Sequence, residues 1–201
     1  MSIRSGVIVA ALVGGAFAAG RLIPSEPNVA LANQPEGMED MMASMQPGEH
    51  HKVLERFVGT WEGDVEFWFA PGTEAMKSHG TIRREWIMDG RFVIEHVEAE
   101  SSGMPFKGMG IVGYNTIENK YENVWLENMA TWISTSSGTY DAAKKTFTFT
   151  GEMLDPQTGK RVKQRSVIDC STPGREVMSG YCPGPDGKEY KNFSGVFVKK
   201  G

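Results

Sequence analysis

Basic residues do not outnumber acidic ones in this sequence. Lys and Arg total 21 against 25 Asp and Glu, a formal net charge of −4. A nucleic-acid-binding domain normally carries a basic patch, so this balance argues against such a partner. Two enzyme motifs are also missing, because there is no Gly-x-Ser-x-Gly, and the Gly-containing turns at 157–160 and 183–188 lack the spacing of a phosphate-binding loop.

Cysteine is scarce, and the spacing of the two cysteines does not favour a disulfide between them. If residues 171–174 (Ser-Thr-Pro-Gly) form a hairpin turn, Cys170 opposes residue 176 and Cys182 opposes residue 164. At about 3.3 Å per strand residue, the two thiols then lie roughly 20 Å apart. A disulfide requires Cα atoms within about 7 Å of each other. We therefore predict no bridge within the chain.

The sequence has no apolar run of full membrane-spanning length. The charge-free segment 5–20 would form a helix of about 24 Å, which is shorter than the roughly 30 Å hydrocarbon core. Arg4 precedes it, and Ala-x-Ala sites follow at 16–18 and 30–32, so residues 1–32 are predicted to be a signal peptide. The alternative is an uncleaved membrane anchor, the one way in which the protein would contact a membrane. The signal peptide and the uncleaved anchor both predict an extracytoplasmic protein, periplasmic or secreted.

Residues 33–47 are predicted to form a Met-rich helical linker. Met38, Met41, Met42 and Met45 share one face of a helix. Thioethers beside His50 and His51 would suit Cu(I), but packing alone produces the same spacing. We therefore expect this methionine face to cover an open barrel end and predict no metal site.

From Gly59 onwards, apolar and polar residues alternate with the period of two that is typical of β-strands. Short turns rich in Gly, Pro, Asn and Asp separate the apolar segments, and none leaves room for a crossover helix, so neighbouring strands must be antiparallel. We predict ten strands, at 60–69, 78–86, 91–98, 106–114, 121–128, 131–136, 146–152, 161–169, 176–181 and 190–199.

Such a meander would leave two exposed edges unless it closes. The fold predicted for residues 48–201 is therefore all-β with short N-terminal helices, an antiparallel up-and-down β-barrel of about ten strands. A barrel of this size holds side chains and one small ligand. A two-sheet sandwich is the alternative, although sandwiches usually need some longer connections.

Two sets of residues resemble known families. Gly59-Thr60-Trp61, after a short helix and at the start of a strand, resembles the Gly-x-Trp signature of lipocalin-like (calycin) barrels. In those proteins the Trp closes one barrel end under a basic residue of the last strand, and this resemblance assigns these roles to Trp61 and Lys199. Across residues 36–200, motifs such as 47–68, 88–98, 104–129 and 138–168 resemble an uncharacterised bacterial family, domain-of-unknown-function family 1579. That resemblance implies a lipocalin-like fold and frequent export, and it supplies no catalytic residue.

The function predicted from the sequence is binding of a small apolar or amphipathic molecule without catalysis and without a cofactor. The expected pocket is lined by Phe67, Trp125 and Tyr181, with Arg165 as its polar anchor. Glu95 and His50 complete the candidate ligand-binding set, which assigns no catalytic residue. An Arg165 that faced Glu95 would form a structural pair or an anion site.

Alternative functions remain open at this point. One is an enzyme acting on a small molecule at the barrel mouth, and another is a structural or interaction domain whose barrel is filled by its own side chains. Haem binding through His79 or His96 is a weaker hypothesis.

Overall fold

The computed structural model describes residues 37–101, 103–155 and 159–201. The predicted signal peptide or anchor at 1–32 lies outside the described residues. The chain divides into two compact units, Met1–Met38 and Glu39–Gly201, and the second contains the barrel. No described helix is long and apolar enough to cross a membrane.

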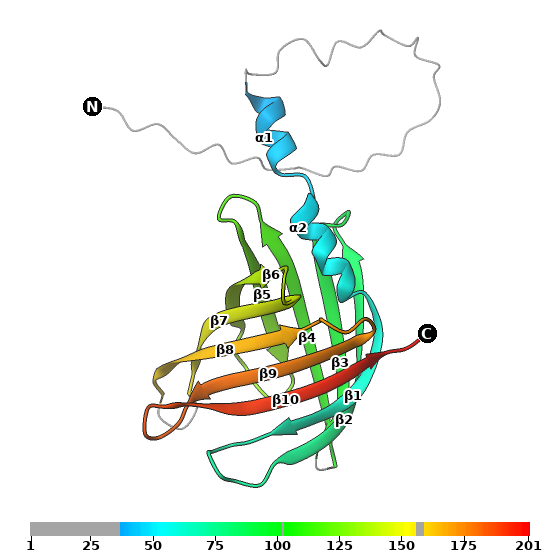
Figure 1. The fold of residues 1–201 in the computed structure, drawn as a ribbon. Helices are drawn as coiled ribbons and strands as arrows, with labels where there is room; N and C mark the ends of the chain where they lie inside the picture. Colours follow the sequence, from blue (N-terminus) through cyan, green and yellow to red (C-terminus); the bar gives the residue numbers. More distant parts are fainter. Residues whose placement is uncertain (1–36, 102, 156–158) are drawn as a thin grey trace, which may run out of the picture. The chain divides into compact units, whose positions relative to one another are not determined.

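Ten antiparallel strands of the described chain close into one barrel, in which β1 is hydrogen-bonded to both β2 and β10 (Figure 1). Every strand pairs with its neighbours in sequence, so the topology is up-and-down. This closure confirms the predicted fold and excludes the sandwich. The strands are β1 (Gly59–Phe67), β2 (Met76–Ile87), β3 (Phe92–Ser101), β4 (Met104–Asn115), β5 (Lys120–Glu127), β6 (Ser134–Asp141), β7 (Thr146–Leu154), β8 (Arg161–Asp169), β9 (Arg175–Pro183) and β10 (Glu189–Lys199).

One strand differs clearly from its predicted position. Residues 131–136 were expected to form it, whereas β6 spans Ser134–Asp141. Most of β6 consists of Ser, Thr and Gly, so the period-two apolar pattern is too weak to locate it. Its place is set by pairing with β7, in which Ser136 opposes Gly151 and Gly138 opposes Phe149. Pairing with the next strand, rather than an apolar pattern within the segment, defines this strand.

The turn between β8 and β9 lies where the sequence placed it. Arg165 opposes Tyr181 and Asp169 opposes Val177, which is the register of a hairpin closed at 171–174. Cys170 and Cys182 lie at opposite ends of this register, and both are free thiols. The predicted absence of a bridge between them is confirmed.

Two short helical segments cover one end of the barrel. Helix α2 (Glu49–Lys52) continues into the 3-10 turn η1 (Val53–Arg56), and Leu54 and Phe57 insert into the barrel end. They pack on a buried cluster that includes Tyr121 and Phe147. This end, with α2 and η1 over it, is the helix-covered end (Figure 1).

The methionine face does not provide this cover. Helix α1 (Met38–Ser44) has no buried residue, and Met41, Met42 and Met45 are each about half exposed. The expectation that the methionine face closes a barrel end was therefore wrong. The apolar positions of residues 53–57 fill that role instead, because they directly precede β1 and are held next to the barrel rim by the chain itself.

Candidate functional site

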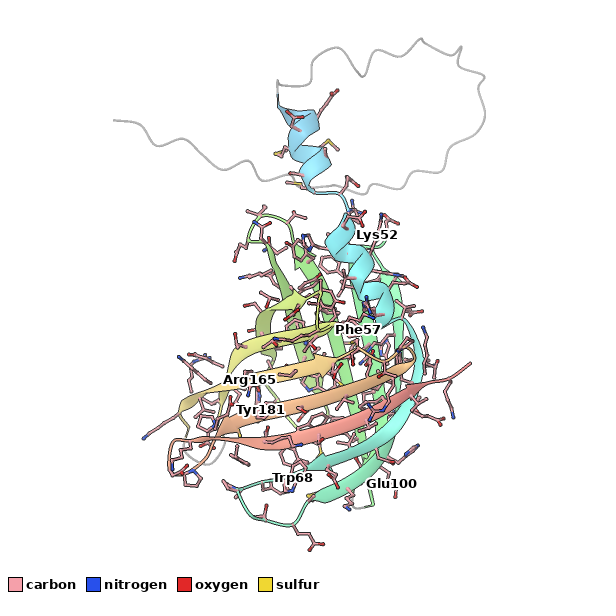
Figure 2. The ribbon with its side chains drawn as sticks, in the orientation of Figure 1. Lys52, Phe57, Trp68, Glu100, Arg165 and Tyr181 are labelled. Atoms are coloured by element: carbon pink, nitrogen blue, oxygen red, sulfur yellow. The ribbon has the colours of Figure 1, made fainter. Side chains whose placement is uncertain are left out.

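The barrel interior contains a cavity of about 580 Å³. It begins at Phe57 at the helix-covered end and extends to the opposite end, where the β1–β2 and β5–β6 connections contribute Phe69 and Met129. Figure 2 places Phe57 beneath the helical turn and Trp68 at the opposite end. Most of the wall is apolar, and its larger side chains include Val65, Phe67, Ile82, Val97, Phe106, Trp125, Met178, Phe193 and Phe197.

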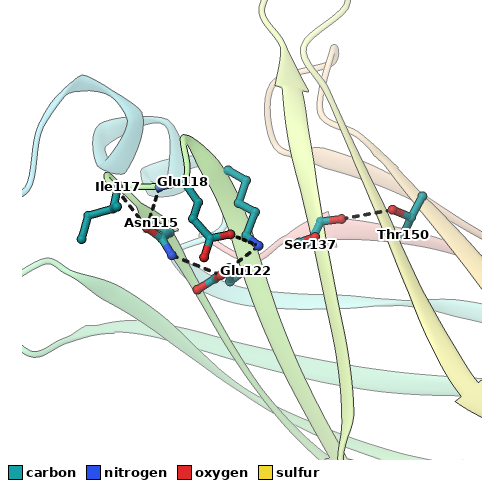
Figure 3. Close-up of polar contacts among 7 residues, drawn as sticks. Asn115, Ile117, Glu118, Glu122, Ser137 and Thr150 are labelled. Atoms are coloured by element: carbon teal, nitrogen blue, oxygen red, sulfur yellow. Dashed lines mark hydrogen bonds and ion pairs between the residues drawn. The ribbon is translucent and has the colours of Figure 1, made fainter. Parts of the chain in front are cut away.

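A second depression, of about 910 Å³, lies over β5 to β8 and the turn between β9 and β10, and it is more open to solvent. Several charged side chains border it, and four of them, Lys120, Glu122, Arg165 and Glu189, are already paired. The ammonium of Lys120 is paired with Glu118 and Glu122, and the Asn115 amide donates to Glu122 at 3.2 Å (Figure 3). Ligand sites are typically enclosed and mostly apolar with few polar groups, so the interior cavity is the better candidate despite its smaller volume.

Five of the six predicted ligand-binding residues line the interior cavity: Phe67, Glu95, Trp125, Arg165 and Tyr181. Trp125 lies flat against β4, because Gly108 presents no side chain there. A Cβ atom at position 108 would be 2.3 Å from Trp125 Cη2. The indole Nε1 donates to Glu127 at 2.9 Å, so the ring is held in the wall by contact on one face and by a hydrogen bond at its edge.

The sixth residue, His50, does not line the cavity. It lies in α2, where its ring stacks on Tyr114 with a centroid separation of 4.2 Å. Its carbonyl oxygen accepts a hydrogen bond from the Tyr121 hydroxyl at 3.0 Å. Tyr121 belongs to the buried cluster under the helical cover. That cluster occupies the barrel end at which α2 lies, so His50 has a packing role.

A buried charged triad lies near the helix-covered end, formed by Arg84 of β2, Glu95 of β3 and Glu176 of β9. Arg84 Nε donates to Glu95 Oε2 at 2.9 Å, and Arg84 Nη1 donates to Glu176 Oε2 at 2.8 Å. Arg84 is 5% exposed and Glu176 1% exposed. Charges are tolerated at such depth only when they are paired and hydrogen-bonded. Arg84 and Glu95 reach the cavity, whereas Glu176 lies behind Arg84.

The triad shifts the protonation of its members. Burial raises the pKa of Glu176 above its ordinary value, although the positive charge of Arg84 opposes the rise. Burial alone would lower the pKa of Arg84, but the two carboxylates outweigh it and raise that pKa. Burial also raises the pKa of the nearby Cys170 thiol to about 12, with Glu176 adding to the effect. Cys170 is therefore an unreactive thiol rather than a nucleophile.

The sequence left open whether Arg165 faces Glu95. In the structure the partner of Glu95 is Arg84, and Arg165 forms a bidentate pair with Glu189, at 3.1 and 2.5 Å. Its guanidinium carbon lies 3.9 Å from the centroid of the Tyr181 ring, and Figure 2 shows Arg165 and Tyr181 side by side on β8 and β9. Arg165 thus borders the cavity while its charge is paired at the barrel surface.

Trp61 lies at the helix-covered end. Only 2% of it is exposed, and its Nε1 donates to the Phe57 carbonyl oxygen at 2.8 Å. Lys199 Nζ lies 5.6 Å from the Trp61 ring centroid and the guanidinium carbon of Arg84 lies 5.9 Å from it. Both distances are within cation–π range. Trp61 therefore joins the helical cover to the first and last strands.

The described residues contain no group of three or more His, Cys, Asp or Glu side chains that could hold a metal ion. His79, one of the two haem candidates, is exposed and pairs through Nδ1 with Asp64 at 2.8 Å. His51 is buried, and its Nδ1 accepts a hydrogen bond from the Gly48 amide at 3.1 Å. Burial is the main cause that lowers the pKa of His51.

A closed antiparallel meander around an internal cavity defines the lipocalin-like class of barrels. Residues 46–199 match the family described as "Protein of unknown function (DUF1579)", and the chain belongs to that family. The family resemblance found in the sequence is thereby confirmed. No curated protein matches the chain in sequence.

Solved structures share the fold. The crystal structure of Rv2717c from M. tuberculosis matches with a TM-score of 0.57 and 12% identity, over 78% of this chain and 100% of that one. The S-type phycobiliprotein lyase CPES from Guillardia theta matches with a TM-score of 0.53 and 12% identity, over 80% of this chain and 97% of that one. At this level of identity, the likeness concerns the barrel architecture.

Proposed function

We propose that this protein binds a small, largely apolar molecule inside its barrel and does not transform it. The observation that carries this proposal is the interior cavity of about 580 Å³, a volume within the roughly 300–1,000 Å³ range of small-molecule sites. Its wall is mostly aromatic and aliphatic, and the polar side chains in it include the buried Arg84 and its partner Glu95. A barrel with only a structural role would be filled by its own side chains.

Binding without catalysis is supported by the state of the candidate nucleophiles. Burial raises the pKa of both Cys170 and Cys182, whereas a catalytic thiol requires a lowered pKa. The proposal includes an extracytoplasmic location, supported by the charge-free segment 5–20 and the Ala-x-Ala sites that follow it.

The test uses a neutral fluorescent apolar probe, N-phenylnaphthylamine, whose emission rises on entering an apolar cavity. The variant Ala99→Phe adds a ring to the cavity wall, where Ala99 faces inward on β3. Its matched control is Glu100→Phe, at the next and exposed position of the same strand. We expect saturable binding by the wild type, an affinity at least about tenfold lower in Ala99→Phe, and little change in the control.

Native mass spectrometry of the protein isolated from its own source provides the second readout, because an endogenous occupant would add a discrete mass. Absence of probe binding together with an unliganded mass would contradict the proposal and favour a structural role. Unchanged probe binding in Ala99→Phe would place the probe outside the cavity and contradict the proposal.

A further inference from the structure

The charges around the cavity are unevenly matched. Four charged residues line it among those described: Arg84, Arg165, Glu95 and Glu127. Both arginines already have carboxylate partners, since Arg84 bonds to Glu95 and Glu176, and Arg165 bonds to Glu189. Glu127 accepts only from the Trp125 indole, a neutral donor. Two carboxylates and two guanidiniums thus line the cavity, and Glu176, buried behind Arg84, adds a third carboxylate.

Arg84, the deepest of these cations, is poorly placed to receive an anion. Two of its edges bond to Glu95 and Glu176. Its guanidinium carbon also lies 5.2 Å from the centroid of the Phe57 ring and 5.9 Å from that of Trp61. A ligand carboxylate would approach a group whose charge is already balanced and would meet Glu95 beside it. Like charges at short range in an apolar surrounding repel strongly.

Acceptor oxygens, in contrast, are available. Glu95 uses Oε2 for Arg84, while its Oε1 lies against Gly110, at 2.5 Å from where a Cβ atom of residue 110 would be. No described side chain donates to this oxygen. Asn123 also lines the cavity, and its buried Oδ1 has no partner within the described chain. Buried polar atoms without partners are rare in proteins, so an unpaired acceptor in a cavity wall is a site at which a ligand could donate a hydrogen bond.

We infer that the occupant of this cavity is an amphiphilic amine, whose protonated nitrogen binds at Glu95 and whose apolar body extends toward the open end. An ammonium group carries donors and no acceptor, which complements a wall that presents unused acceptors. A charge-assisted bond to a carboxylate is about twice as strong as a neutral one. This inference rests on the proposed function, since it names the chemistry of the ligand for the same cavity.

The triad favours a cation for a second reason. Glu176 Oε1 is buried without a partner, so one carboxylate of the triad is only half satisfied by Arg84. An ammonium bound at Glu95 would bring a positive charge into the same interior region and reduce this imbalance. A carboxylate ligand would increase it.

The experiment compares three probes of ten carbons each that carry different head groups: decylamine, decanol and decanoate. Each competes with N-phenylnaphthylamine for the full-length wild-type protein at neutral pH, below the concentration at which the probe aggregates. We expect decylamine to bind at least about tenfold more tightly than decanoate, with decanol between them. This ranking requires no substitution, so it does not depend on how any variant folds.

The variant Glu95→Gln tests the assigned contact. It removes the charge while keeping the shape, and we expect it to bring decylamine to within about threefold of decanol, without weakening decanol itself. Its matched control is Glu98→Gln, an exposed position on the same strand. The control removes an equal charge from the outer face, so it should preserve the ranking and exclude a general effect of net charge.

The outcomes separate this inference from the function on which it rests. Binding of decanol and decanoate as tightly as decylamine would overturn the amine assignment and leave the cavity as an apolar binding site. An unchanged ranking in Glu95→Gln would overturn the assignment of Glu95. Failure of all three probes and of N-phenylnaphthylamine to bind would overturn the proposed function together with the inference.

Discussion

Arg84 and Glu176 are 92 residues apart in the chain and form a hydrogen-bonded ion pair inside the barrel, with 2.8 Å between Nη1 and Oε2. The pair joins β2 to β9 across the interior. These strands are not neighbours in the sheet. It therefore adds a side-chain contact between parts of the wall that the strand hydrogen bonds do not connect directly.

Removing Arg84 should destabilise the fold severely. Arg84→Met leaves Glu95 and Glu176 without their shared cation, and breaking a buried pair in this way costs about 3–5 kcal/mol. Urea denaturation measures the loss. The control Arg83→Met changes the neighbouring exposed residue and should shift the free energy of unfolding by about 0.5 kcal/mol or less. Equal effects of the two substitutions would contradict a special role for the triad.

The pH dependence of stability should reveal Glu176. Its pKa in the folded protein is raised above the ordinary value of 4.5, so the native state holds this proton more tightly than the unfolded chain does. Stability therefore decreases as the pH rises from about 4.5 through the folded pKa, and remains lower above it. The variant Glu176→Gln carries a neutral amide that does not ionise, so this contribution to the pH dependence is absent from it.

The stability of Glu176→Gln relative to the wild type should accordingly increase over that pH window. Urea denaturation of both proteins at a series of pH values measures the difference. If the wild type instead became more stable relative to Glu176→Gln as the pH rises, attraction to Arg84 would outweigh the burial of the carboxylate.

Gly108 should be essential for the position of Trp125. In Gly108→Ala the new methyl group would lie 2.3 Å from Cη2 of the indole, so the ring must move into the cavity. We expect a loss of about 1–3 kcal/mol, as for other overpacked cores, together with a changed tryptophan emission spectrum. Gly48→Ala is the control, because no atom lies within 4 Å of a Cβ at that position. An unchanged spectrum in Gly108→Ala would contradict the described contact.

The two thiols should differ in reactivity. Cys170 is buried, and its pKa is raised to about 12, so very little thiolate exists near pH 8. Cys182 is only partly buried. A disulfide reagent such as dithionitrobenzoate should modify Cys182 first and Cys170 only after unfolding. The variant Cys182→Ser should react very slowly when native, and rapid reaction of this variant would show that Cys170 is accessible.

The sequence predicted the barrel because nearly every strand alternates apolar and polar residues and every connection is too short for a helix. Five of the six residues that it proposed for the pocket line the cavity, and two of them, Phe67 and Trp125, lie in strands with a clear inner face. The position of β6 was missed, because Ser and Gly residues such as Ser136 and Gly138 carry almost no apolar periodicity. The methionine face was misassigned because helical spacing does not specify what the helix packs against.

Arg84 and Glu176 were not predicted, although a local indication existed. Arg84 is two residues from Ile82 and four from Gly80, and alternate residues of a strand face the same side. Arg84 therefore lies on the inner face of β2. Its neighbour Arg83 concealed this, because two adjacent arginines look like a solvated strand edge. The pairing with Glu176 could not be deduced from either strand alone, since it depends on the closure that brings β2 and β9 to face each other.

The bonding of β10 to β1 also constrains how the chain can be synthesised. Phe67 pairs with Phe193 and Trp61 with Lys199, so the final seam forms only after almost the whole polypeptide has left the ribosome. Until then β1 and the most recently made strand are unpaired edges, which are templates for intermolecular strand addition. A product truncated before residue 189 would therefore not form a smaller barrel. It would remain an open sheet that is prone to aggregate.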